Sequence, residues 1–303
     1  MRKRQFDSDR NFFGLGKSTG KKPIVVVGIP WDLTSSYRRG AAEAPDAIRK
    51  ATDSKLYNRY TEQGVDLAAQ VKVCDHGNAR KARNAMELKK SIVSAIKVHD
   101  HNNAASLFLG GDHFVTFPAF ESVAELQGQP LSLLYFDAHP DLYETYEGKL
   151  NSHATVVSRI LDNRSASNGK VCYVGLRAST MEQENRIVKL GLTKYTSHDV
   201  FAKGSQEICN SLKSILKDTL VYLSVDLDGL DPAFAPGVAN PQPGGLSSRQ
   251  LFDIIQNLND LQIVAADIVE YSPRCDTDAR TTASTSAVLI KEIMWAMAKP
   301  LRR

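Results

Sequence analysis

The sequence predicts an α/β domain in which helices cover both faces of a mostly parallel sheet. Eight short apolar runs are continuous rather than alternating, which is typical of strands that are buried on both faces. Helical patterns lie between these runs, and a regular alternation of strand and helix predicts parallel strands joined by helices.

The candidate strands and helices extend over most of the chain. The strand-like runs are PIVVVGIP from Pro23, VKVCD from Val71, ASLFLGG from Ala105, LSLLYFD from Leu131, KVCYVGL from Lys170, LTKYT from Leu192, TLVYLSVDLD from Thr219 and IVAADIVE from Ile263. The clearest helical patterns are AMELKKSIVSAIKVHD from Ala85, QEICNSLKSILKD from Gln206, SRQLFDIIQNL from Ser248 and ASTSAVLIKEIMWAMAK from Ala283.

The chain divides into a short basic start and one domain. Residues 1–22 contain seven Lys/Arg and two Asp/Glu, whereas the rest contains 31 basic and 32 acidic residues. We therefore interpret residues 1–22 as a basic arm that is solvated or contacts another subunit. No repeat, low-complexity tract or Pro/Gly/Ser linker follows residue 22, so residues 23–303 are predicted to form a single domain.

Composition argues against several classes of function. No apolar run approaches the roughly 18 residues of a membrane span, and no apolar segment typical of a secretory signal follows the basic start. We expect a cytoplasmic protein. The net charge of +4 comes from the arm, which disfavours a nucleic-acid-binding face. The four cysteines are far apart and form no CxxC pair, so we expect reduced and mostly buried thiols.

Polar motifs follow three of the apolar runs, where the carboxyl ends of parallel strands form ligand sites. GGDH places His113 after the third run, and two glycines there allow a tight turn. DAHPD places Asp137, His139 and Asp141 after the fourth run, and DLD places Asp226 and Asp228 after the seventh. A spacing of two would point the members of each cluster the same way on an extended backbone.

The four aspartates require compensating cations if they converge. A single aspartate at a strand end is usually a cap, but four at one sheet edge repel and resist ionisation. Two divalent cations balance their charge, and His113 and His139 each add a nitrogen ligand. Carboxylate and imidazole ligands without a thiolate favour Mn²⁺. Two such ions share a bridging water, lower its pKa to about 7 and direct the hydroxide at an electrophilic carbon.

These three motifs resemble the metal motifs of the ureohydrolases, the arginase and agmatinase family. The resemblance extends to GIPWDLTSSYRRG at residues 28–40 and to VEYSP at 269–273, so it covers nearly all of the chain beyond the arm. It implies a three-layer α/β/α fold around an eight-stranded parallel sheet. It also implies homo-oligomers, commonly trimers or hexamers.

The resemblance assigns a role to each site residue. It implies that His113, Asp137, Asp141 and Asp226 hold one manganese ion, and that Asp137, His139, Asp226 and Asp228 hold the other. Two residues outside the ligand sets act on the substrate. His153, in SHATVV, would pass a proton to the leaving amine, and Glu270 would bind the guanidinium through paired hydrogen bonds. The histidines at 76, 99, 101 and 198 lack such placement and are interpreted as structural or exposed.

The resemblance favours agmatine as the substrate, cleaved to putrescine and urea in polyamine biosynthesis. Arginases carry an asparagine two residues past the equivalent of Asp141, where this chain has Tyr143. DLY here, with DPAFAPG at 231–237 and PGGL at 243–246, resembles agmatinases. The chain departs from the agmatinase pattern in two places. Ala154 stands where many agmatinases have glycine, and residues 238–242 read VANPQ instead of TGTPE.

Other substrates and other classes of protein stay open at this point. Guanidinobutyrate, guanidinopropionate, arginine and formiminoglutamate would suit the same catalytic core. A related deacetylase would usually need one zinc ion, and the six candidate ligands argue against it. A non-catalytic metal-binding relative would be expected to have lost a ligand or His153, and neither is lost.

Overall fold

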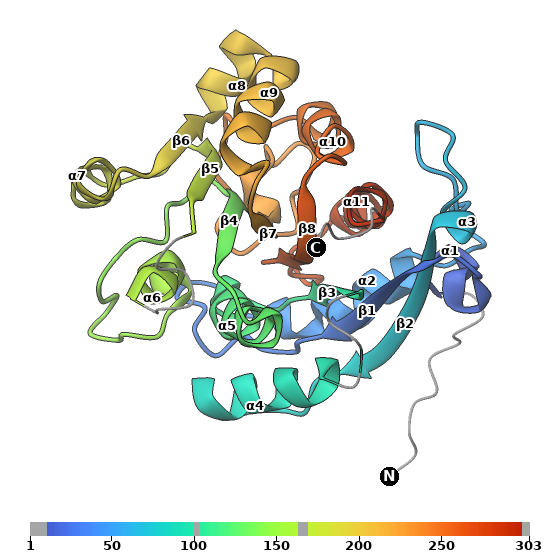
Figure 1. Cartoon of the computed structure of the whole chain (residues 1–303). Helices are drawn as coiled ribbons and strands as arrows, with labels where there is room; N and C mark the ends of the chain where they lie inside the picture. The colour runs from blue at the N-terminus through green and yellow to red at the C-terminus, as the bar shows by residue number, and fades with distance from the viewer. Residues whose placement is uncertain (1–10, 98, 100–102, 163–168, 299–303) are drawn as a thin grey trace.

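The computed structural model describes residues 11–97, 99, 103–162 and 169–298. Within them, all eight predicted runs form strands of one parallel sheet, in the order β2-β1-β3-β8-β7-β4-β5-β6 (Figure 1). The predicted fold class is therefore confirmed. The strands are β1 (Lys22–Gly28), β2 (Val71–Asn78), β3 (Ala105–Leu109), β4 (Leu131–Phe136), β5 (Val171–Leu176), β6 (Thr193–Thr196), β7 (Leu220–Asp226) and β8 (Gln262–Val269).

The helices begin and end at residues with the expected capping chemistry. The Asn84 side chain accepts a hydrogen bond from the backbone of Glu87 at the start of α4, and Ser247 and Gln250 form a capping box on α10. The four predicted helical patterns are confirmed. The principal helices are α2 (Ala44–Ala51), α4 (Ala85–Ile96), α5 (Thr116–Gln127), α6 (Val156–Asp162), α7 (Met181–Leu190), α8 (Ser197–Lys203), α9 (Ser205–Leu216), α10 (Ser248–Gln256) and α11 (Thr281–Ala296).

The helices bury a separate apolar core on each face of the sheet. One core includes side chains of α2, α9, α10 and α11, and the other includes side chains of α4, α5, α6 and α7. Figure 1 shows α4, α5 and α6 on one side of the strands and α9, α10 and α11 on the other. This is the three-layer arrangement, and it leaves the strand ends for polar side chains.

The end of the predicted arm packs into the domain. Within α1 (Asn11–Gly14) and the following turn, Phe12, Phe13 and Leu15 are buried. The backbone amides of Phe12 and Phe13 donate to the side chain and the carbonyl of Thr52. The described start of this segment thus belongs to the core, because burial of its two phenylalanines stabilises the fold while its basic side chains can stay in solvent. Residues 1–10 lie outside the described residues.

The order of the strands brings the polar motifs together. Strand β8 lies between β3 and β7, and β4 lies on the other side of β7. In the ladders, Leu109 and Val225 both pair with Ile268, and Phe136 pairs with Val225. The residues that follow these four strands therefore meet at one edge of the sheet. No helix in the described part of the chain is long and apolar enough to cross a membrane.

Candidate metal centre and active site

His113 is positioned by a close contact between two backbones. A Cβ atom on Gly111 would lie 1.6 Å from the carbonyl oxygen of Trp31, and the amide of Asp112 donates to that same oxygen. Gly111 is therefore required by this close approach, in addition to the turn expected from the sequence, and residues 111 and 112 do lie in a bend. The short helix His113–Val115 follows and directs the buried imidazole toward β4 and β7.

Asp137, His139 and Asp141 converge, although not on an extended backbone. Strand β4 ends at Phe136, and the amide of His139 donates to the Asp137 carboxylate. Asp141 has a φ of 46°, in the left-handed region that non-glycine residues rarely adopt. The extended-strand explanation is thus wrong, because a turn brings the Asp141 side chain back toward Asp137.

The second aspartate pair also lies in a turn. Asp226 is the last residue of β7, and Asp228 lies in the short helix Leu227–Gly229, with its amide bonded to the Asp226 carboxylate. The guanidinium of Arg177 donates to backbone carbonyls at 228, 229 and 230 and to that of Gln242. A single arginine therefore fixes the loop that carries Asp228.

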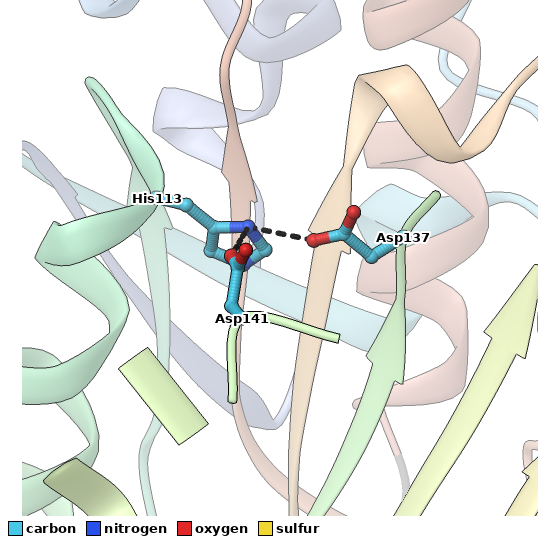
Figure 2. A group of neighbouring side chains, drawn as sticks. All are labelled: His113, Asp137 and Asp141. Atoms are coloured by element: carbon cyan, nitrogen blue, oxygen red, sulfur yellow. Dashed lines mark ion pairs between the residues drawn. The ribbon is translucent and has the colours of Figure 1, made fainter. Parts of the chain in front are cut away.

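The candidate ligands form two groups that share Asp137. His113 Nδ1 lies 2.9 Å from Asp137 Oδ2 and 3.3 Å from Asp141 Oδ2 (Figure 2). His139 Nδ1 lies 3.4 Å from Asp137 Oδ1 and 3.1 Å from Asp228 Oδ2. In each group of three, the ligand atoms lie within 4.8 Å of one another.

Asp226 is placed beside the first group. Its Oδ2 atom lies 2.9 Å from His113 Nδ1. It is not a member of either group of three, whereas the resemblance implies that it binds both metals. The convergence of all six predicted ligands at this sheet edge is a feature of the structure, and their roles as ligands stay a prediction.

The buried carboxylates of this cluster repel one another, and bound cations would compensate their charge. Burial and the neighbouring Asp137 carboxylate raise the pKa of Asp141 to about 7, and the same two causes raise the pKa of Asp228. Burial lowers the pKa of His139, but the Asp228 and Asp137 carboxylates outweigh it and raise that pKa to about 12. Asp137 Oδ2 is buried and accepts no hydrogen bond of regular geometry from the described residues, although His113 Nδ1 lies 2.9 Å away. A buried carboxylate oxygen and an imidazole nitrogen that converge in this way suit a shared metal ion, so the residues fit a dinuclear centre.

His153 and Glu270 lie next to the cluster and face each other. His153 Nδ1 is 3.9 Å from Glu270 Oε1, and His153 Nε2 is 2.9 Å from the Ser36 hydroxyl. Glu270 Oε1 accepts a hydrogen bond of 2.8 Å from the His113 amide, and Glu270 has a φ of 61°. Burial lowers the pKa of His153 to about 4, and positive charge on His113 and His139 acts in the same direction.

A cavity of about 410 Å³ opens above these residues. Its lining also includes Tyr143, Tyr146, Glu147, Asn240 and Gln242, which are more exposed than the buried candidate ligands and therefore form its outer part. Glu147 and Gly148 have φ values of 49° and 72° in a tight turn between the bridged residues Tyr146 and Lys149, as in type I′ turns. No lysine or arginine of the described chain lines the cavity.

The sequence did not assign a role to several residues of this site. Ser36 lies in the motif at 28–40, to which the resemblance assigns no role, and Asp112 holds that loop by accepting hydrogen bonds from the amide and hydroxyl of Thr34. The sequence predicts Tyr135 as part of an apolar strand, yet its hydroxyl contacts the cluster. The position of Tyr135 near the carboxyl end of β4 is the feature that could indicate this contact.

The other histidines and the cysteines lie apart from the cavity. His76 and His99 contact each other, with their Nε2 atoms 2.7 Å apart, and His198 is exposed. His101 lies outside the described residues. All four cysteines are free thiols, of which Cys172 and Cys209 are buried.

The fold and the paired His/Asp groups define a class of protein, a three-layer α/β/α protein with a candidate dinuclear metal centre at the carboxyl edge of a parallel sheet. Comparison with known proteins narrows this class. The model of the Arginase family matches residues 22–296. The chain belongs to the Arginase family and is a ureohydrolase.

Known relatives include both arginases and agmatinases. The chain is 35% identical to the mitochondrial arginase 1 of Oryza sativa subsp. indica, over 92% of this chain and 83% of that protein. It is 33% identical to the agmatinase of Chromobacterium violaceum, over 88% and 81% of the two chains. A crystal structure of a hypothetical agmatinase from Burkholderia thailandensis superposes with a TM-score of 0.82 at 29% identity, covering 92% of this chain and 87% of that one.

Proposed function

We propose that the protein hydrolyses agmatine to putrescine and urea with two Mn²⁺ ions per chain. His113, Asp137, Asp141 and Asp226 would hold one ion, and Asp137, His139, Asp226 and Asp228 the other. The observation that carries the proposal is the pair of His/Asp groups that share Asp137 and open, beside His153 and Glu270, into one cavity. Bound manganese supplies a water that is acidic enough to attack a guanidinium carbon at neutral pH.

Glu270 binds and orients the guanidinium in this proposal. Its Oε1 atom already accepts a hydrogen bond from the His113 amide, which fixes the carboxylate. Its other oxygen accepts no hydrogen bond from the residues that the structure describes, so it can accept an N–H of the planar cation, and a charged bond of this kind also sets the orientation of the cation. The left-handed backbone at Glu270 costs of order 1 kcal/mol or more, which is common where a side chain must point into a site.

His153 transfers a proton to the leaving amine. The Ser36 hydroxyl contacts Nε2, so that Nδ1 is the nitrogen turned toward Glu270. The Tyr146 ring packs edge-on against the imidazole at 6.0 Å and holds its plane. An imidazole that is neutral near pH 7 and can gain and lose one proton suits this task.

The outer lining of the cavity favours a substrate that is cationic at both ends. Glu147 supplies a carboxylate there, and Tyr143 and Tyr146 offer apolar surface for a four-carbon chain. With no lysine or arginine in the lining of the described structure, the carboxylate of guanidinobutyrate or formiminoglutamate would lose water without gaining a cation.

Arginine is the second candidate, because arginases are among the relatives at 35% identity. Tyr143 stands where arginases direct an asparagine at the α-carboxylate, so we expect agmatine to lead arginine by at least about 10²-fold in kcat/KM. The measurement is urea release from agmatine, arginine, guanidinobutyrate and formiminoglutamate with Mn²⁺ present. Equal kcat/KM values for agmatine and arginine, or a preference for an acidic guanidine, would contradict the proposal that agmatine is the preferred substrate.

Two variants sharpen this comparison. Glu147→Gln should lower kcat/KM for agmatine about two- to fivefold, because Glu147 is exposed and an exposed charge pair is worth about 0.2 to 1 kcal/mol. Glu144→Gln is the matched control, since Glu144 is an exposed glutamate of the same segment that pairs with Arg186 outside the cavity.

We also expect the protein to form a trimer or hexamer, and light scattering measures this oligomeric state.

A further inference from the structure

Tyr135 contacts two candidate ligands of the same metal position. Its hydroxyl donates to Asp141 Oδ2 at 2.8 Å and lies 3.1 Å from His113 Nδ1. Its ring is stacked on the His113 imidazole, with the centroids 4.5 Å apart and the planes 6° from parallel. The side chain is fully buried at the carboxyl end of β4. One residue therefore contacts both His113 and Asp141.

The nitrogen that faces Tyr135 is the one expected to bind metal. His113 Nε2 lies 3.0 Å from the Ser224 hydroxyl, which Asp267 orients by accepting its proton at 2.7 Å. Nδ1 is thereby left for the carboxylates and for Tyr135. A second contact of this kind fixes the ring orientation of a ligating histidine.

Asp141 depends on an outside anchor more than the other aspartates do. Its φ of 46° is disfavoured for a non-glycine residue, and such conformations persist where surrounding contacts fix them. Its carbonyl accepts from the Val157 amide, and its carboxylate accepts from Tyr135. Asp228, in the other group, is instead anchored by the backbone amide of Ala138.

We propose that Tyr135 is a positioning residue that sets the affinity of one metal position, formed by His113, Asp137 and Asp141, and leaves the position formed by Asp137, His139 and Asp228 unaffected. The inference rests on the proposed dinuclear centre. A tyrosine in an apolar core would otherwise need only some partner for its hydroxyl. Here the partners are two ligands of one group, and this selectivity can be measured.

The test is a titration of metal-free protein with Mn²⁺, in which electron paramagnetic resonance measures the free ion. Tyr135→Phe keeps the stacked ring and removes the hydroxyl. It should bind one ion with unchanged affinity and the other about 10- to 100-fold more weakly, the range for loss of a group that supports a ligand. Binding of both ions as in the unmodified protein would overturn the proposal, and so would equal weakening of both.

Tyr271→Phe is the matched control. Tyr271 is also a buried tyrosine, two residues past the end of β8, and its hydroxyl donates to Asp276, which is not a candidate ligand and contacts none. It should bind both ions as the unmodified protein does, and weakening of either ion to the same degree as in Tyr135→Phe would also overturn the proposal. The unfolding midpoints of the metal-free variants show that each is folded. If the unmodified protein bound no Mn²⁺, the proposed function itself would fail, which is a separate result.

Discussion

Glu270→Gln should separate substrate binding from stability. The amide oxygen can replace Oε1 in the 2.8 Å bond from the His113 amide, which places the new NH₂ group where the second carboxylate oxygen was. The charged hydrogen bond to the guanidinium is then lost, and the NH₂ group of the substituted side chain faces the N–H groups of the guanidinium, so that two donors meet without an acceptor. Loss of such a bond costs about 1.5 to 3 kcal/mol, so kcat/KM should fall roughly 10- to 100-fold.

The same change should leave the fold intact or stabilise it. Glu270 is only 5% exposed, and burial together with the Asp112 carboxylate raises its pKa well above the usual value. A neutral amide relieves that cost, so the unfolding midpoint of the metal-free protein should not fall. Urea-release kinetics, Mn²⁺ content and thermal unfolding are measured on one preparation.

Glu292→Gln is the control for Glu270→Gln. Glu292 is a fully buried glutamate on α11 that accepts a backbone hydrogen bond from Glu62 and does not line the cavity. Its substitution should leave kcat/KM unchanged. Full efficiency in Glu270→Gln would refute the binding role of Glu270, and loss of Mn²⁺ would make Glu270 part of the metal centre instead.

Three further predictions concern the metals, His153 and the core. Protein reconstituted with Mn²⁺ should carry two ions per chain by elemental analysis, and a plateau at one ion with full activity would contradict the dinuclear centre. His153→Asn should retain Mn²⁺ and lose about 10²-fold in turnover, whereas loss of Mn²⁺ would show a ligand. Lys22→Met should stabilise the protein at pH 7 by about 1 to 3 kcal/mol in chemical unfolding, because Lys22 is 3% exposed and its Nζ has no hydrogen-bond partner among the described residues. Burial lowers the pKa of Lys22 from 10.5 to about 8, so the cost of the buried charge is present in full below pH 8 and absent above pH 10.5. A gain that persists above pH 10.5 would contradict this cause.

The fold and the convergence of the polar motifs could be predicted, because both follow from the order of strands and helices along the whole chain. Continuous apolar runs identify buried parallel strands, and the carboxyl ends of parallel strands lie at one edge. Asp137 and Asp226 each lie at or directly after a strand end, so their placement follows from strand assignment alone.

The local geometry could not be predicted, because it is set by contacts between distant segments. Residue type does not predict the left-handed backbone at Glu270, and at Asp141 it only permits it, because aspartate adopts this conformation more readily than most residues. Ser36 reaches His153 because Thr34 is bonded to Asp112, which is 78 residues away. Phe12 is buried although it lies in residues 1–22, which carry a net charge of +5.

The position of β8 has a consequence for synthesis of the chain. The last strand along the sequence fills the middle of the sheet, between β3 and β7. A nascent chain that ends before residue 262 holds two half-sheets, each with a long apolar edge at which unpaired strands can associate with other chains. His113 belongs to one half and Asp137 and Asp226 to the other, so both the candidate metal centre and protection from aggregation are completed only when β8 inserts.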